Sequence, residues 1–103
     1  MKRAVGLICA VFTTAATSAD YTVTMAGMNY QPASLQVKIG DVIRFVNDDG
    51  ANHEVLIPTK GFGADLGLQK SGTRVELKMQ KAGTFEVECV LHPHMLMKIN
   101  VTE

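Results

Sequence analysis

The chain has 103 residues, of which 47% are hydrophobic, and its 10 basic side chains (Lys and Arg) balance its 10 acidic ones. This length suits one small domain with a single core. The basic residues form no stripe and the acidic residues form no tail, so the charge pattern argues against nucleic acid or a charged membrane surface as a partner.

The first nineteen residues have the features of a secretory signal peptide. Lys2 and Arg3 give a positive start, and residues 4–16 form an apolar run that is too short to cross a membrane. The small residues that follow end at Ala19, where we predict cleavage. We therefore expect an exported protein, located in the periplasm, from which residues 1–19 are removed.

Cleavage after Ala19 leaves a mature domain, residues 20–103, with one cysteine. Cys9 is removed with the leader, and its lipidation is disfavoured because Ile8 stands where a small residue is expected. Cys89 is then unable to form an internal disulfide, and an unpaired thiol is a liability in an oxidising compartment. A bound metal ion would protect it.

Beyond the leader, hydrophobic residues alternate with polar ones at the period of two that is typical of β-strands. Seven such segments, separated by Gly, Pro, Asn or Asp, are predicted: 21–25, 35–39, 42–47, 53–57, 75–79, 85–89 and 97–101. Residues 58–72 contain four glycines and are expected to form an irregular excursion with at most one helical turn. The pattern predicts an all-β, antiparallel-rich sandwich of two sheets with about seven to eight strands.

Residues 89–95 carry three side chains that suit a soft metal ion. Cys89, His92 and Met95 provide a thiolate, an imidazole and a thioether at a C-x-x-H-x-x-M spacing. These donors suit copper that cycles between Cu(I) and Cu(II), whereas hard ions such as Mg²⁺ and Ca²⁺ prefer oxygen ligands. One more imidazole would complete a His₂Cys set with an axial Met, which is a blue-copper electron-transfer site.

The strand before this motif determines where its cysteine points. In residues 85–89, Glu86 and Glu88 share one face, which must be the solvent face, so Cys89 points toward the interior. A thiolate in that position needs a cation beside it, and copper would supply one. His53 is the only histidine outside the motif, so it is the one residue able to supply the remote imidazole.

Three stretches of the mature chain match a known pattern of residues. They are residues 28–49 with His53 following, the segment Ala-Gly-Thr-Phe-Glu-Val-Glu-Cys that ends at Cys89, and the short Cys-x-x-His-Pro-x-Met loop. On these stretches, nearly all of residues 20–103 resembles the cupredoxin family, which includes plastocyanin and azurin. Within that family the short loop is similar to that of the amicyanin-type blue copper proteins.

The resemblance implies a cupredoxin fold, which is a Greek-key β-sandwich, with one copper ion that changes between Cu(I) and Cu(II). It implies His53, Cys89 and His92 as equatorial ligands and Met95 as the weak axial ligand. A protein of this kind is a one-electron carrier and not an enzyme.

The resemblance also implies two contacts outside the ligand set, of the kind that orient metal ligands. The side chain of Asn47 would tie the two ligand-bearing segments together, although a turn residue that closes its strand is an equally simple interpretation. The backbone N–H of Glu54 would donate toward the sulfur of Cys89.

His92 is the expected electron port, because its loop reaches the surface while His53 lies within a strand. Pro93, Leu96 and Met28 would surround it with apolar surface, which suits weak and transient docking. The expected partners are a c-type cytochrome or a periplasmic dehydrogenase or oxidase. We expect a monomer with no membrane span.

Three alternatives stay open. A periplasmic copper carrier or resistance protein would use the same site, with His94 and Met97 as extra donors, and Met97 would compete with Met95 as axial ligand. A colourless zinc site would use Cys89 and all three histidines of the chain. A thiol enzyme would use Cys89 as its nucleophile, but no orienting acid is evident.

Overall fold

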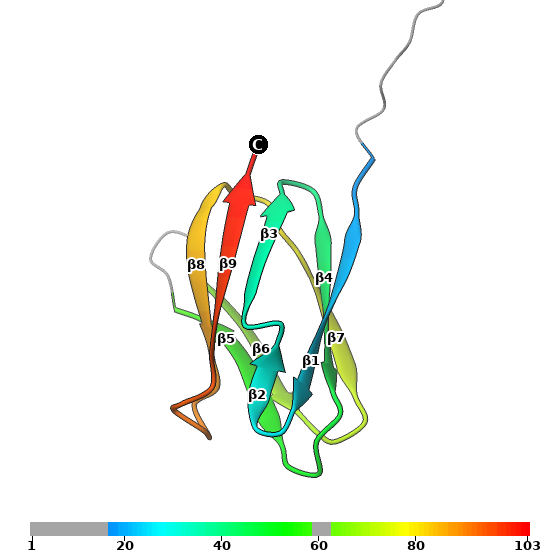
Figure 1. Cartoon of the computed structure of the whole chain (residues 1–103), viewed down its shortest axis with the longest axis vertical. Coiled ribbons are helices and arrows are strands. Elements are labelled where there is room, and N and C mark those ends of the chain that lie inside the picture. Colours follow the sequence, from blue (N-terminus) through cyan, green and yellow to red (C-terminus); the bar gives the residue numbers. More distant parts are fainter. Residues whose placement is uncertain (1–16, 59–62) are drawn as a thin grey trace, which may run out of the picture.

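The computed structural model describes residues 17–58 and 63–103, which form two β-sheets packed face to face (Figure 1). Nine strands make these sheets: β1 (Asp20–Ala26), β2 (Asn29–Gln31), β3 (Ser34–Lys38), β4 (Val42–Asn47), β5 (His53–Ile57), β6 (Ala64–Gln69), β7 (Arg74–Lys78), β8 (Gly83–Glu88) and β9 (Leu96–Thr102). One sheet has the order β2-β1-β4-β7 and the other β3-β9-β8-β5-β6. In this part of the chain there is no helix, and so none that could span a membrane. The predicted all-β sandwich is confirmed.

Most neighbouring strands run antiparallel, as predicted. The exceptions are the β1–β4 and β3–β9 pairs, which run parallel. Parallel neighbours cannot be joined by a tight hairpin, so the chain must cross away and return between them. Here it crosses to the opposite sheet, since β3 belongs to one sheet and β4 to the other.

Two of the nine strands, β2 and β6, lie where no strand was predicted. The expectation of an irregular excursion over residues 58–72 is wrong for β6, while residues 59–62 lie outside the described part of the chain. β6 pairs with β5 through a register shift between Glu54 and Leu56, and Gly67 has a φ of 78°. Because pairing uses backbone N–H and C=O groups, a glycine-rich segment can join a sheet without alternating side chains.

A two-residue turn joins β1 to β2. Ala26 pairs with Asn29, and Gly27 and Met28 between them have φ values of 58° and 60°. Turns with two positive φ values match the twist of the strands that they join. A positive φ is uncommon for a residue with a side chain. Both N–H groups of this turn donate to the carboxylate of Asp49, at 2.8 and 2.9 Å.

The alternation of β8 continues into the residue that follows it. Phe85, Val87 and Cys89 are at most 4% exposed and belong to the core between the sheets. Glu86 is exposed and Glu88 is half-buried on the opposite face. The prediction that Cys89 points into the interior is therefore confirmed.

The strand ends bring the predicted ligands to one end of the sandwich. β5 begins at His53, and the β8–β9 connection, residues 89–95, contains the motif. Figure 1 places this connection and the β4–β5 loop at the same end of the domain, away from the C-terminus.

Candidate metal centre

Residues 89–95 fold into a compact loop held by its own backbone. The N–H of His92 donates to the carbonyl of Cys89 at 3.1 Å, and the N–H of Met95 donates to the carbonyl of His92 at 2.8 Å. The N–H of Cys89 donates back to the carbonyl of Met95 at 3.4 Å, which closes the loop. The three-residue spacing of the motif therefore matches two successive hydrogen-bonded turns.

The remote imidazole comes from β5. His53 is fully buried, and its Nδ1 lies 3.2 Å from Nδ1 of His92 and 4.0 Å from Sγ of Cys89. Sγ of Cys89 lies 3.7 Å from Nδ1 of His92. The structure thus brings together Cys89 and His92, which the spacing of the motif singled out, and His53, the one histidine outside the motif.

These separations suit one metal ion. An ion bound at about 2.0–2.1 Å from nitrogen and about 2.3 Å from sulfur holds its donors roughly 3.3–3.8 Å apart. The three observed distances, 3.2, 3.7 and 4.0 Å, lie close to that range. Two imidazoles and a thiolate are donors that suit copper or zinc rather than magnesium or calcium.

The sulfur of Cys89 has a hydrogen bond from outside the donor group. The backbone N–H of Glu54 donates to Sγ at 3.3 Å, which is the contact that the resemblance implied. Tyr30 in turn donates its hydroxyl to the carbonyl of Glu54 at 2.6 Å. Burial, followed by the nearby charges of Cys89 and Glu54, raises the pKa of Tyr30, so its hydroxyl remains a donor. Tyr30 thus helps to fix the residue that donates to the thiolate.

The second ring nitrogen of His53 contacts a carboxylate that the sequence analysis missed. Nε2 lies 2.7 Å from Oδ2 of Asp49. The N–H of Met28, the His53 ring and the N–H of Gly27 all hold the pKa of Asp49 below its ordinary value. An ionised Asp49 accepts a hydrogen bond, so Nε2 of His53 carries the proton and Nδ1 keeps its lone pair for a metal. A carboxylate four residues before a candidate ligand was the available signal.

Asn47 is fully buried and makes three side-chain hydrogen bonds. Its amide N–H₂ donates to the carbonyls of Ala51 and Gln69 at 2.9 and 2.8 Å, and its Oδ1 accepts from the N–H of Asp49 at 2.9 Å. These bonds join the β4–β5 loop to the end of β6. They do not reach the 89–95 loop, so the tie differs from the one that the resemblance implied.

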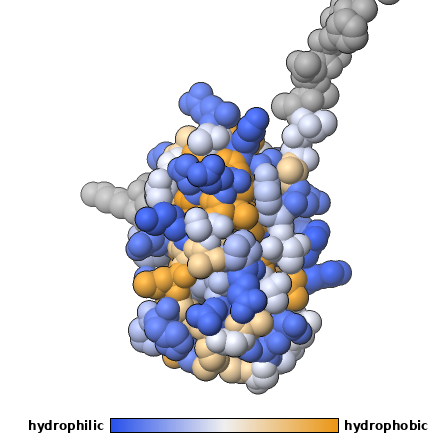
Figure 2. Space-filling model, viewed as in Figure 1, coloured by the Kyte–Doolittle hydropathy of each residue, from blue (hydrophilic) through white to orange (hydrophobic). Residues whose placement is uncertain are grey.

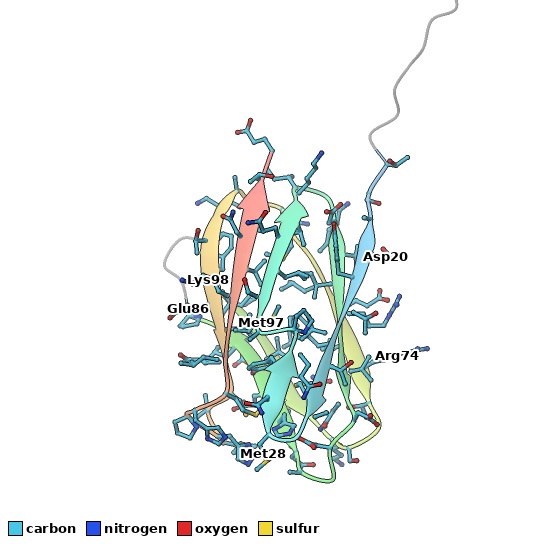
Figure 3. All side chains as sticks on the ribbon, viewed as in Figure 1. Asp20, Met28, Arg74, Glu86, Met97 and Lys98 are labelled. Carbon is cyan, nitrogen blue, oxygen red and sulfur yellow. The ribbon has the colours of Figure 1, made fainter. Side chains whose placement is uncertain are left out.

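The two methionines near the motif occupy different places. Met95 is fully buried within the hydrogen-bonded loop that also carries Cys89 and His92. Met97 lies on β9, opposite Val87, with its side chain in the core (Figure 3). The loop position favours Met95 over Met97 as a fourth ligand.

His94 is exposed and lies outside the donor group. Its ring centroid is 6.3 Å from that of His92, and among the described residues the close cluster of possible ligands contains His53, Cys89 and His92 without it. A zinc site with three histidines is therefore not assembled here. Cys89 is 1% exposed, which disfavours a role as an enzyme nucleophile.

Comparison with known proteins gives one family. A family model described as the cupredoxin-like domain matches residues 3–101. Amicyanin from Paracoccus denitrificans is 33% identical over 82 residues, which cover 77% of this chain and 63% of amicyanin. The methylamine utilization protein MauL from Methylorubrum extorquens is 29% identical over 83 residues, covering 80% and 73% of the two chains. The chain thus spans somewhat less than two thirds of amicyanin.

Solved structures agree with this result. A copper(I) form of an amicyanin variant superposes with a TM-score of 0.74 at 26% identity, covering 80% of this chain and 81% of the other. A copper-containing nitrite reductase from Thermus scotoductus gives a TM-score of 0.76 at 25% identity. The match covers 82% of this chain but 22% of the reductase, so the similarity is to one part of that enzyme.

Proposed function

Because the chain belongs to the cupredoxin-like family, we propose that it is a type 1 copper protein that carries one electron at a time between other proteins. The observation that carries this proposal is the cluster of two imidazole nitrogens and one buried thiol sulfur, all within 4.8 Å of one another. His53, Cys89 and His92 would hold the copper ion, with Met95 as the weaker axial ligand.

A copper ion bound at this site would supply the redox chemistry, because it can change between Cu(I) and Cu(II). The protein's part is to keep the donors in place when the charge changes, because small rearrangements mean a small barrier to electron transfer. Asp49 holds the ring of His53, and the N–H of Glu54 restrains the sulfur of Cys89. The hydrogen-bonded loop fixes His92 relative to Cys89.

His92 is the proposed route for the electron. Its ring is half-buried whereas that of His53 is fully buried, so His92 is the imidazole nearer to solvent. Copper-binding through Nδ1 would leave its other ring nitrogen to face a partner. No substrate is transformed in this role, so the protein would not be an enzyme.

Apolar side chains around His92 support a docking surface there. Val90, Leu91 and Leu96 are each more than half exposed, and the half-buried Met28 lies at the same end of the domain (Figure 3). On the face seen in Figure 2, hydrophilic residues predominate, and hydrophobic areas lie between them, one of them in the upper half of the domain, away from the candidate metal centre. A small apolar patch suits brief contacts with a redox protein. We propose a c-type cytochrome, or a periplasmic dehydrogenase or oxidase, as partner.

Export is part of the proposal. An unpaired, copper-protected thiol fits an oxidising compartment, and the amino-terminal leader supports delivery to the periplasm. Residues 1–16 of that leader lie outside the described part of the chain.

Addition of Cu(II) to the metal-free protein tests the proposal. One equivalent is expected to produce an intense visible Cys-to-copper charge-transfer band and the matching EPR signal, because Sγ of Cys89 lies among the donors. Zinc provides the control, since it fills the site without colour. A protein that binds Cu(II) without an intense band would contradict the proposed site.

A copper carrier is the second candidate, and the position of His94 favours it. An exposed imidazole whose ring lies 6.3 Å from that of His92 is placed to receive a copper ion that enters or leaves. If the protein is a carrier, replacing His94 by Phe should slow copper transfer to a chelator about tenfold or more. A loss of this size is typical when a side chain that assists a metal site is removed. If it is an electron carrier, H94F should keep the transfer rate and the rate of electron exchange with a cytochrome c. Stopped-flow absorbance at the charge-transfer band measures both rates.

A further inference from the structure

A buried carboxylate lies at the end of the sandwich opposite the candidate metal centre. Asp41, in the turn between β3 and β4, is 4% exposed. Its Oδ2 accepts the N–H of Lys38 at 2.8 Å, and its Oδ1 accepts the N–H of Ala19 at 2.9 Å. The two backbone N–H groups are the main reason that the pKa of Asp41 lies below its ordinary value. Ala19 thus supplies one of the two N–H groups that stabilise this carboxylate.

Ala19 is also part of the sheet. The N–H of Val42 donates to its carbonyl at 3.0 Å, which extends the parallel β1–β4 ladder by one bond beyond the Asp20–Val42 pair. Cleavage after Ala19, as the sequence suggested, would remove the partners of both Oδ1 of Asp41 and the N–H of Val42. A buried polar group that loses its partner destabilises the fold. The structure therefore favours a mature chain that keeps Ala19.

We propose that the leader is cleaved between Ser18 and Ala19, so that the new α-ammonium group of Ala19 forms an ion pair with the buried carboxylate of Asp41. This inference rests on the proposed export of the protein and not on its copper chemistry. Hydrolysis adds one water across the Ser18–Ala19 peptide bond: the carboxylate leaves with the leader, and the amine gains a proton. Small residues, Ala16 and Ser18, stand at the third and first positions before the bond, as signal peptidases require.

The local chemistry favours a charged group at this position over a peptide N–H. The bond from the peptide N–H to the ionised Asp41 is already charge-assisted. An ammonium group would add the Coulomb attraction between two opposite charges. The nitrogen of Ala19 already lies 2.9 Å from Oδ1, so the pair would form without movement of the strand. The residues before it, Thr17 and Ser18, are exposed and precede β1, where a peptidase can reach the chain.

The mature amino terminus is the direct test. The full precursor is expressed with export to the periplasm, and the purified protein is analysed by intact mass and amino-terminal sequencing. A chain that begins at Ala19 is the expected result. A chain that begins at Asp20 or at Thr17, or one that keeps the leader, would overturn the proposal. The copper-binding proposal is unaffected by any of these outcomes, because this readout does not involve the metal.

The ion pair has its own signature in the pH dependence of stability. The titratable side chains that border this corner are Tyr21, Lys38 and Lys78, from β1, β3 and β7. The carboxylate raises the pKa of the α-ammonium above its unfolded value of about 7.7–8.0. The stabilisation that the ion pair gives to the fold is therefore fully present below the unfolded pKa of the α-ammonium. It is lost as the pH rises through the pKa of this group in the folded protein. The Asp41 contribution, from a lowered pKa, is lost as the pH falls.

A comparison of free and acetylated amino termini measures this signature. Chains that begin at Ala19 are prepared in both forms, and their melting midpoints are recorded at mildly acidic and strongly alkaline pH. Acetylation should lower the midpoint by a few degrees at pH 6 and have no effect near pH 11. In the control variant D41N, acetylation should have no effect at either pH. An equal midpoint for the free and acetylated chains at pH 6 would contradict the ion pair.

Discussion

Replacing Cys89 by Ser is expected to abolish the visible charge-transfer band of the copper-loaded protein. The band requires a thiolate bound to the metal, and a serine hydroxyl is a harder and far less acidic donor. Cys89 is 1% exposed in the core, and Ser has nearly the same volume, so the sandwich itself should persist. Titration with Cu(II), followed by visible absorbance and EPR, measures the loss of the band.

Two controls make the result specific. Circular dichroism of the metal-free C89S protein should retain the β-sheet spectrum, which separates loss of the ligand from loss of the fold. In M95L the band should change in energy or intensity, whereas in M97L it should stay as in the parent protein, because Met97 lies in the core on β9. Retention of the band in C89S would remove the basis of the proposed site.

Replacing Asn47 by Leu is expected to reduce the free energy of unfolding by about 3–5 kcal/mol, as for other buried groups that lose several hydrogen bonds. The substitution keeps the volume but leaves the carbonyls of Ala51 and Gln69 and the N–H of Asp49 without their present partner. Small domains have only about 5–15 kcal/mol of stability in total. Urea unfolding of the metal-free protein measures the difference.

The same variant also tests how the loop before His53 is held. Asp49 contacts Nε2 of His53, so a displaced Asp49 should also shift the reduction potential of the copper-loaded protein. The matched control is N52L, because Asn52 is an exposed residue of the same loop. A loss of less than about 1 kcal/mol in N47L, comparable to a surface substitution, would show that the three bonds are not needed.

The strands that the sequence predicted share a clear period of two, and all seven are present. The two that were missed have other reasons to pair. β2 has three residues, which is too short to show a period, and β6 contains Gly67 at a positive φ beside a register shift. In both, the position of a neighbouring strand determines that the segment is extended. Local side-chain alternation carries no information about such a neighbour.

Some features of the candidate site could likewise be predicted from the sequence, and others depend on the tertiary structure. The candidate donors Cys89, His92 and Met95 lie within one short loop, so their types and spacing are visible in the sequence. The alternation of buried and exposed residues in β8 predicts that the thiol of Cys89 points inward, as it does. The contact between Asp49 and His53 depends on where the β1–β2 turn lies, because Gly27 and Met28 hold the same carboxylate. The contact between Tyr30 and Glu54 likewise joins two strands of different sheets.

The sequence by itself determined the types of the candidate donors, the inward direction of Cys89 and that His53 is the one histidine outside the 89–95 loop. Each of these depends on residue type or on a period of two, which are local properties of the chain. Only the tertiary structure decided that the donor atoms of His53 and His92 lie 3.2 Å apart, that Asp49 orients His53, and that Ala19 belongs to the fold. These facts depend on which distant strands pair and in what register, and that pairing is decided by the packing of the whole sandwich.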